Sequence, residues 1–374
     1  MSERLVFREA TLTSGEMIDI AIEDGVIVEV TAAGQAAGDR TMDCSGLYVS
    51  SGWIDLHVHA FPDFDPYGDD IDEIGVKQGV ATIVDAGSCG ADRIGDLAAR
   101  REKATTTVFA LLNVSKIGLL RVDELSDLTW LDREYALRAV QGNPDFIVGW
   151  KARMSGSVVL DNGIEPLRIA KKLSEATDLP LMVHIGSAPP RIEDILPLLD
   201  KEDVVTHYLN GKSNHLFDAN GCPIPELTSA IERGVLLDVG HGTASFSFKV
   251  AEAAKRSGVR FDTISSDIYR GNRLYGPVRS LAHVMSKFLL LGYPLSEVID
   301  AVTVRAAEWL KKPELGRIQV GDKANLTLFA LNDQSMTFVD SEGDKRIGNH
   351  QIEAKGVYVN GRFVKCEIRF ETRH

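Results

Sequence analysis

The chain has 374 residues, enough for one large barrel with an accessory module, and its 44% of hydrophobic residues argues against a disordered chain. A formal net charge of −13 without a long basic cluster argues against a nucleic-acid partner. No apolar run approaches about 18 residues, so a membrane partner or span is not expected either.

The N-terminal 50 residues have the pattern of a small β unit. The start MSERLVFREATL carries charges where a signal peptide needs an apolar core, so we expect a cytoplasmic protein. Period-two alternation follows, with Asp24-Gly25 as a hairpin turn, and the chain from residue 316 onward returns to this pattern with Asn360-Gly361 as a second turn. The four cysteines lack CxxC spacing, which indicates neither a disulfide framework nor a zinc knuckle.

The middle of the chain, residues 51–315, alternates short apolar runs with longer segments of helical pattern, which is typical of βα units and a parallel sheet. The predicted strands are 53–58, 80–85, 106–113, 146–151, 180–185, 203–207, 235–240 and 262–267. The predicted helices are 69–78, 92–103, 132–142, 165–177, 191–199, 224–233, 246–257 and 276–291. Eight strands in about 260 residues predict a (β/α)8 TIM barrel.

Side chains suited to metal binding recur at the ends of the predicted strands. His57 and His59 project from one face of the first strand, because side chains two residues apart share a face. Taken alone, such a pair also suits packed core or surface histidines. The fourth, fifth, sixth and eighth strands end in Lys151, His184, His207 and Asp267. In a barrel these ends share one face, where imidazole and carboxylate groups suit zinc or a similar divalent ion.

These residues carry a resemblance to a known family. HxH after strand one, Lys after four, His after five and six and Asp after eight is the pattern of the amidohydrolase superfamily. The stretches GWIDLHVHAF, GWKARMSG, MVHIG, THYLNG, LLDVGHG and SSDIYRG resemble its bacterial deacetylase branch, which is related to dihydroorotases and hydantoinases. The resemblance covers essentially the whole chain. It implies that residues 1–50 and 316–374 pair into a small β-sandwich domain beside a metal-dependent barrel of residues 51–315.

The resemblance also implies a binuclear metal centre with two divalent ions, for which we expect Zn²⁺. His57 and His59 would bind the more buried ion, and His184 and His207 the more exposed one. The residues themselves leave zinc, manganese, iron and cobalt open, because affinity order alone does not select a metal in the cell.

Lys151 and Asp267 complete the implied centre. Lys151 would be N6-carboxylated and bridge the two ions, since a protonated lysine offers only donors and repels a cation. Asp267 would contact the buried ion, hold the bridging hydroxide and act as general acid and base. The alternatives are a strand-end lysine paired with an acid and an aspartate that caps the following helix.

Five further residues near the strand ends are candidates for substrate binding: Arg153, His241, Tyr208, Asn210 and Tyr269. Arg153 lies two residues after Lys151 and offers a bidentate grip on a carboxylate, with an internal ion pair as the alternative. His241 could hydrogen-bond either the substrate or a loop carbonyl. The other three lie on loops and also suit structural roles.

We therefore expect a metal-dependent hydrolase that removes an acyl group, with acetyl implied by the resemblance, from an N-acyl amino acid or a similar acylated small carboxylate. A cyclic-amide hydrolase of the dihydroorotase or hydantoinase kind would use the same residues. A non-catalytic, metal-free binding module is the alternative from another class. The sequence leaves open whether the chain forms a homo-oligomer.

Overall fold

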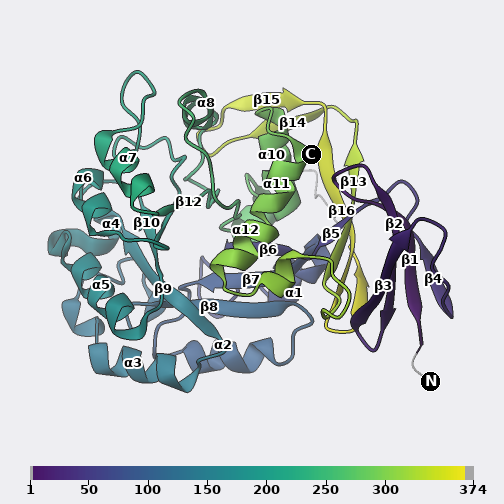
Figure 1. Ribbon diagram of the computed structural model, residues 1–374. Coiled ribbons are helices and arrows are strands. Elements are labelled where there is room, and N and C mark those ends of the chain that lie inside the picture. Colours follow the sequence, from purple (N-terminus) through teal and green to yellow (C-terminus); the bar gives the residue numbers. More distant parts are fainter. Residues whose placement is uncertain (1–2, 367–374) are drawn as a thin grey trace.

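The computed structural model describes residues 3–366, which form a mixed α/β fold with two sheets side by side (Figure 1). One sheet is parallel, curls strongly and is flanked by helices, while the other is built from the two ends of the chain. His374 and the last part of the expected terminal β domain, residues 367–374, lie outside the described residues.

The parallel sheet is made of β6 (Trp53–Val58), β7 (Val80–Ala86), β8 (Thr107–Asn113), β9 (Ile147–Met154), β10 (Leu181–Ile185), β11 (Val204–Thr206) and β12 (Leu236–Asp238). Their order in the sheet is β12-β11-β10-β9-β8-β7-β6, so each strand lies beside its neighbour in the sequence. All positions of β6 and β7 are buried, which explains why these strands are almost continuously apolar. Each of the seven overlaps a strand predicted from the sequence.

The eighth predicted strand, residues 262–267, is irregular in the structure. Thr263 forms an isolated parallel bridge with Asp238 of β12, and Ile268 forms another with Val58 of β6. The segment therefore contacts both edges of the seven-stranded sheet. The curled parallel sheet is established, while its description as a complete eight-stranded barrel remains a prediction.

Helices lie along the outside of the parallel sheet, where α1 to α7 connect its strands and α8 to α12 follow its last strand. They are α1 (Ile71–Ile74), α2 (Ile94–Arg101), α3 (Arg133–Gly142), α4 (Gly156–Val159), α5 (Glu165–Thr177), α6 (Ile192–Ile195), α7 (Pro225–Glu232), α8 (Phe248–Arg256), α9 (Arg270–Tyr275), α10 (Leu281–Leu290), α11 (Leu295–Ala301) and α12 (Val304–Trp309). Short 3₁₀ turns lie at η1 (Val76–Gln78), η2 (Gly118–Leu120), η3 (Leu128–Trp130), η4 (Leu160–Asn162), η5 (Leu196–Leu198) and η6 (Pro313–Gly316). Within residues 3–366 no helix has the length and apolar character needed to cross a membrane.

The helix predicted over 276–291 begins later than expected. The side chain of Ser280 accepts a hydrogen bond from the backbone N–H of His283 (3.0 Å), which caps α10 and starts it at Leu281. Helices α4, α9, α11 and α12 fall outside the predicted set, because each is too short to show a clear apolar period.

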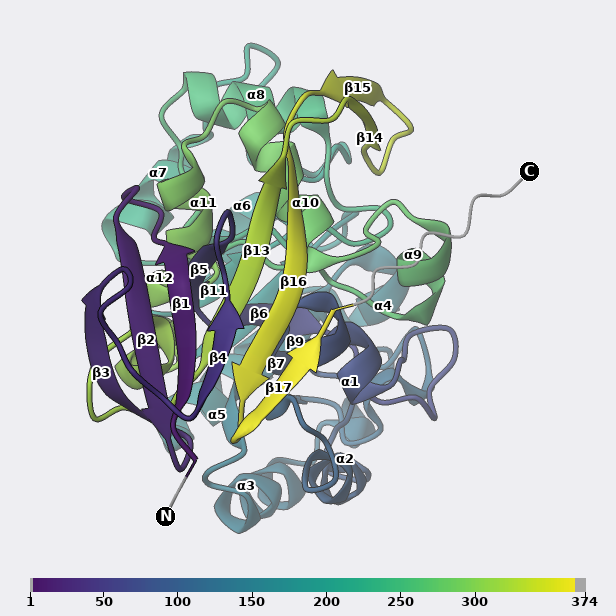
Figure 2. The same cartoon turned by 90° about the vertical axis from the view of Figure 1, so that its right-hand side faces the viewer.

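The two ends of the chain form one eight-stranded sheet (Figure 2). Its strands are β1 (Leu5–Thr11), β2 (Met17–Glu23), β3 (Val26–Ala32), β4 (Arg40–Asp43), β5 (Tyr48–Ser51), β13 (Leu326–Asn332), β16 (Gln351–Val359) and β17 (Arg362–Lys365). Antiparallel pairing of β5 with β13 joins the N-terminal strands to the C-terminal ones. Both predicted hairpin turns are confirmed, since Asp24-Gly25 and Asn360-Gly361 have positive φ at each position. The sandwich arrangement of this sheet remains a prediction.

A separate hairpin, β14 (Met336–Val339) and β15 (Lys345–Gly348), leaves the terminal sheet and lies beside α8 and α10 (Figure 2). Arg346 forms an ion pair with Glu252 of α8 (3.1 Å). Asp340, in the turn of the hairpin, accepts a hydrogen bond from the backbone N–H of Phe248 at the start of α8 (2.9 Å). The C-terminal segment therefore supports loops of the parallel-sheet region as well as the terminal sheet.

Candidate metal centre and active site

Four imidazole rings gather where the parallel strands end. His57 belongs to β6, His59 follows it, His184 belongs to β10 and His207 follows β11. The ring of His57 lies 5.6 Å from that of His59 and 5.0 Å from that of His207, measured between centroids. The rings of His184 and His207 are 4.3 Å apart. The structure thus brings together all four histidines that the sequence singled out.

Lys151 and Asp267 lie within the same cluster. The Nζ atom of Lys151 is 2.9 Å from His57 Nε2, and Asp267 Oδ1 is 3.1 Å from His59 Nε2 and 3.5 Å from His57 Nε2. Lys151 is fully buried, and this burial lowers the pKa of its amine to about 7, although the Asp267 and Asp238 carboxylates oppose the shift. Burial therefore favours the uncharged amine of Lys151.

Asp267 stands on the irregular eighth segment, and two contacts fix that segment. Its backbone N–H donates to the carbonyl of His57 (2.7 Å), and the neighbouring Ser266 N–H donates to the carboxylate of Asp55 on β6 (3.0 Å). Asp267 has a φ of 53° and His207 a φ of 71°. Backbone strain of this kind is tolerated where surrounding contacts hold the residue, which is common at functional sites.

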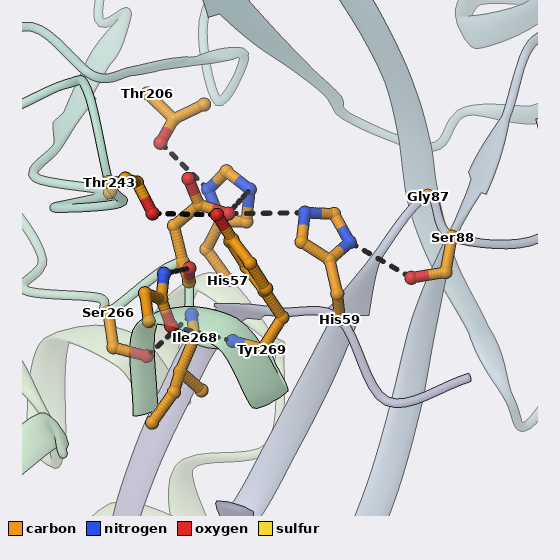
Figure 3. Close-up of polar contacts among 12 residues, drawn as sticks. His57, His59, Gly87, Ser88, Thr206, Thr243, Ser266, Ile268 and Tyr269 are labelled. Carbon is orange, nitrogen blue, oxygen red and sulfur yellow. Dashed lines mark hydrogen bonds and ion pairs between the residues drawn. The ribbon is translucent and has the colours of Figure 1, made fainter. Parts of the chain in front are cut away.

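The rings of His57 and His59 each contact a hydroxyl group, that of Thr206 and that of Ser88 (Figure 3). Thr206 donates to Asp238 (2.7 Å), so its oxygen accepts from Nδ1–H of His57 (3.0 Å). The backbone N–H of Ser88 donates to the carboxylate of Asp85 (2.8 Å), and the Ser88 hydroxyl lies 2.9 Å from His59 Nδ1. In the ring of His57 the proton is then on Nδ1, which leaves its Nε2 lone pair directed at the cluster.

His207 is oriented by the backbone instead. Its Nδ1–H donates to the carbonyl oxygen of Gly240 (2.6 Å), so its Nε2 carries a lone pair. That Nε2 is buried and has no hydrogen-bond partner among residues 3–366. One ligand atom each from His57, His207 and Asp267 lie within 4.8 Å of one another. Buried lone pairs and a carboxylate at this spacing fit a divalent cation, so these residues form a possible metal site.

Glycines make room for three members of the cluster. A methyl group on Gly87 would lie 2.6 Å from Cγ of Lys151, and one on Gly240 would lie 2.8 Å from Nδ1 of His207. A methyl group on Gly242 would collide with the carboxylate of Asp267. All three glycines also have positive φ, so both their backbone conformation and their surroundings exclude a side chain.

A cavity of about 220 Å³ opens beside the cluster. Its wall is mostly polar, with four serines and a threonine: Ser155, Ser157, Ser187, Ser245 and Thr243. His57, His59, His184, Lys151 and Asp267 also line it. A cavity of this size and polarity suits a small, hydrogen-bonding substrate.

Two of the five substrate-binding candidates, Arg153 and Tyr269, line this cavity. Tyr269 hydrogen-bonds Thr243 across its rim (2.7 Å; Figure 3). Tyr208 does not line the cavity, because its side chain is 1% exposed and packs in the hydrophobic core. Asn210 is also turned away, since its amide donates to the carbonyl of His207 (2.9 Å) within a tight loop.

His241 lies outside the cavity wall as well. Its Nδ1–H donates to the carbonyl of Gly242 (2.8 Å), and its Nε2 lies 2.7 Å from the ammonium of Lys287. The ring stacks on Phe246, with centroids 4.5 Å apart. Of the two roles that the sequence left open for His241, the structure shows the contact with a loop carbonyl.

Sequence reasoning missed Tyr67, Glu124 and Lys212, three aromatic or charged residues of the cavity region. Arg153 forms an ion pair with Glu124 (3.1 Å), which is fully buried, and lies over the ring of Tyr67 at 5.7 Å. Lys212 also lines the cavity. None of these three residues stands at a strand end, and their sequence surroundings are those of ordinary loops, so no periodic signal could have revealed them.

Comparisons with known proteins agree with this geometry. The sequence pattern of the amidohydrolase family matches residues 162–364. A curated deacetylase from Enterococcus faecalis (strain ATCC 700802 / V583) is 42% identical over 365 residues, which are 97% of this chain and 99% of that protein. A deacetylase from Agrobacterium fabrum (strain C58 / ATCC 33970) is 38% identical over 334 residues, covering 86% of this chain and 80% of the relative.

Solved structures are similar over the same length. A crystal structure of an adenine deaminase has a TM-score of 0.94 at 41% identity and covers 96% of this chain and 99% of its own. A crystal structure of a dihydroorotase has a TM-score of 0.89 at 33% identity and covers 97% of this chain and 99% of its own. The chain therefore belongs to the amidohydrolase family and is a hydrolase that acts on carbon–nitrogen bonds.

Proposed function

We propose that the protein is a metal-dependent hydrolase that removes an acyl group, with acetyl as the first expectation, from an N-acyl amino acid or a similar acylated small carboxylate. The observation that carries the proposal is the cluster of four imidazoles, Lys151 and Asp267, of which three imidazoles, Lys151 and Asp267 line one small polar cavity. The deacetylase names of three relatives at 37% to 42% identity support the acyl chemistry.

In this proposal the metal ligands share a (β/α)8 barrel that is closed by the segment 263–268, beside a β-sandwich of the terminal strands. His57 and His59 would hold the more buried of two divalent ions, for which we expect Zn²⁺. His184 and His207 would hold the more exposed one. The unpartnered Nε2 of His207 and the Nε2 of His57, which faces Lys151 and Asp267, support this assignment.

Lys151 would join the centre as a carbamate. The addition of CO₂ to a lysine requires the neutral amine, and burial lowers the pKa of Lys151 to about 7. The added group replaces a donor-only side chain by two oxygen acceptors and reverses its charge. Gly87 has no side chain, so the aliphatic part of Lys151 can pack directly against its backbone.

The chemistry divides between the ions and the protein. Bound ions would supply a lowered pKa for water and polarisation of the acyl carbonyl. The carboxylate of Asp267 accepts the proton of the attacking water and returns it to the leaving nitrogen as the carbon–nitrogen bond breaks. Arg153 and Tyr269, which line the cavity, hold the remainder of the substrate.

Cyclic-amide hydrolysis is the second candidate, because a dihydroorotase structure resembles this chain at 33% identity over nearly its whole length. Ring opening of a cyclic amide would use the same aspartate and the same ions. The adenine deaminase structure suggests a third substrate class, the neutral purine, for the same cavity.

The experiment is a substrate panel assayed with the zinc-loaded full-length chain. It compares N-acetyl amino acids of both hands with dihydroorotate, hydantoin and adenine. We expect turnover of N-acetyl compounds to exceed that of the others. Activity confined to the cyclic amides or to adenine would overturn the proposal in favour of the corresponding alternative.

Replacement of Asp267 by Asn tests the proton transfer. We expect turnover to fall by about a hundredfold to ten-thousandfold, because general acid–base catalysis contributes effects of this size. Zinc content, measured by plasma mass spectrometry, should stay close to that of the wild type, since the histidines remain. Asp300→Asn, at an exposed position of α11, is the control and should leave turnover unchanged. Undiminished turnover of the Asp267 variant would remove this residue from the mechanism.

A further inference from the structure

The cavity contains positive charges that the structure balances unequally. Arg153 is compensated by Glu124, whose side chain is completely buried and lies 3.1 Å away. Burial raises the pKa of Glu124, and the charge of Arg153 opposes this shift because it favours the ionised carboxylate. Arg153 and Glu124 together contribute no net charge to the cavity.

Lys212 is different. Its ammonium group has no hydrogen bond or ion pair with any residue of the described range 3–366, although it lines the cavity. The charges that act on it through space are Asp267, which attracts it, and Arg153, which repels it. In the proposed reaction Asp267 is already engaged with His59 and the metal centre. Lys212 is therefore a partly buried cation without a dedicated counter-ion.

The backbone of Lys212 is nevertheless fixed. Its N–H donates to the side-chain oxygen of Asn210 (3.0 Å), and the amide of Asn210 donates to the carbonyl of His207 (2.9 Å). The preceding residue, Gly211, packs closely on Glu342. A methyl group on Gly211 would collide with the carboxylate of Glu342. Glu342 itself accepts a hydrogen bond from Ser247 (2.6 Å). A tight turn thus connects Lys212 to a proposed metal ligand.

We infer that Lys212 selects monoanionic substrates by pairing with their carboxylate, while Arg153 is neutralised by Glu124 and contributes hydrogen bonds. This inference rests on the proposed function and narrows its substrate class to compounds with a single negative charge next to the scissile group. Desolvating a cation without a partner is unfavourable, and a bound carboxylate removes that penalty. A neutral substrate would leave the charge uncompensated when it fills the cavity.

The test uses pairs of compounds of which one carries the carboxylate and the other is neutral. One pair is an N-acetyl amino acid and its carboxamide, and the other is dihydroorotate and dihydrouracil. Lys212→Met should lower kcat/KM for the carboxylates by about tenfold to a hundredfold, mainly through KM, with less than about a threefold change for the neutral partners. Lys212→Arg should recover most of the loss. Lys172→Met, at an exposed position of α5, is the control and should leave kcat/KM unchanged for both the charged and the neutral compounds.

Binding of each pair is measured by calorimetry alongside turnover, so that a compound which binds without reacting still reports on Lys212. Equal losses for charged and neutral compounds in the Lys212→Met variant would overturn the inference, as would a wild-type preference for the neutral partner. If the wild type acts on dihydroorotate and not on N-acetyl compounds, the proposed function fails while Lys212 is still tested by the second pair. Activity confined to adenine would overturn both.

Discussion

His57 and His59 differ from His207 in what holds their rings. The first two are oriented by side-chain hydroxyls, Thr206 and Ser88, which contact buried carboxylates. The third is oriented by the backbone carbonyl of Gly240 and stands at a positive φ itself. A hydrogen bond from a side chain can be removed by substituting that side chain. A hydrogen bond to a backbone carbonyl can be changed only by altering the conformation of the loop. The two halves of the proposed centre should therefore fail in different ways when they are mutated.

Gly240→Ala is the strongest test of backbone support. The new methyl group would collide with the Thr206 hydroxyl and lie 2.8 Å from His207 Nδ1, at a φ of +49°. We expect zinc affinity to fall by more than about a hundredfold, with about 2 to 5 kcal/mol lost from the free energy of unfolding. Competition with a chromophoric chelator measures the first quantity, and urea unfolding the second.

Gly163→Ala is the matched control, because Gly163 has a φ of +53° and open space where the methyl group would go. The Gly163→Ala variant should lose about 1 to 2 kcal/mol of the free energy of unfolding, from backbone strain alone, and should bind zinc with wild-type affinity. If both variants keep the wild-type zinc affinity, the loop at Gly240 does not position His207.

Thr206→Val should have an intermediate effect. It removes the acceptor for His57 Nδ1–H while keeping the shape of the side chain, so we expect zinc affinity to fall by about tenfold to a hundredfold. Excess zinc should restore turnover, because no reacting group is lost. The measurement is turnover as a function of free zinc.

Thr263→Val separates the two roles of the Thr206 hydroxyl. Thr263 donates to the same carboxylate, that of Asp238 (2.7 Å), and has no hydrogen bond to a histidine among the described residues. The Thr263→Val variant should therefore have a lower free energy of unfolding and an unchanged zinc affinity. Equal affinity losses in the two valine variants would assign the effect to Asp238 rather than to the orientation of His57.

Lys287→Met should have the smallest effect on the centre, because Lys287 contacts His241, which is not a proposed ligand. Burial lowers the pKa of Lys287 to about 7, below its ordinary 10.5. Between these values the unfolded chain binds a proton that the folded chain does not, so raising the pH through this window stabilises the folded state. The wild type should gain up to about 1.4 kcal/mol per pH unit over the variant. Urea unfolding at pH 7.5, 8.5 and 9.5 measures this difference.

Zinc affinity of the Lys287 variant should equal that of the wild type. A stability difference that stays constant from pH 7.5 to 9.5 would contradict the lowered pKa. A loss of zinc would show instead that the support of the centre extends to His241.

The sequence predicts the cluster well because its information is local. Lys151, His184 and His207 each end an apolar run, and the ends of parallel strands meet on one face. The structure brings these residues together with His57, His59 and Asp267 as expected. Strand-end position predicts this convergence, while the roles of these residues as metal ligands remain predictions.

Loop residues were predicted less well, because their directions depend on single backbone angles. Tyr208 was expected to face the substrate, but His207 adopts a φ of 71° and Tyr208 is buried in the core. The contact between His57 and Thr206 joins residues 149 positions apart, so no periodic pattern in the sequence indicates it. Lys212 is likewise placed by a turn rather than by a strand.

The pairing of β5 with β13 also sets the order in which the molecule can be completed during synthesis. The backbone N–H of Trp53, at the start of the strand that carries the first histidines, donates to Thr327, 274 residues later (3.2 Å). A nascent chain therefore carries β5 without its β13 partner until most of the polypeptide has been made. Unpaired strand edges of this kind are open to pairing with other chains. The start of β6 therefore lacks its contact with Thr327 until synthesis has passed through β13.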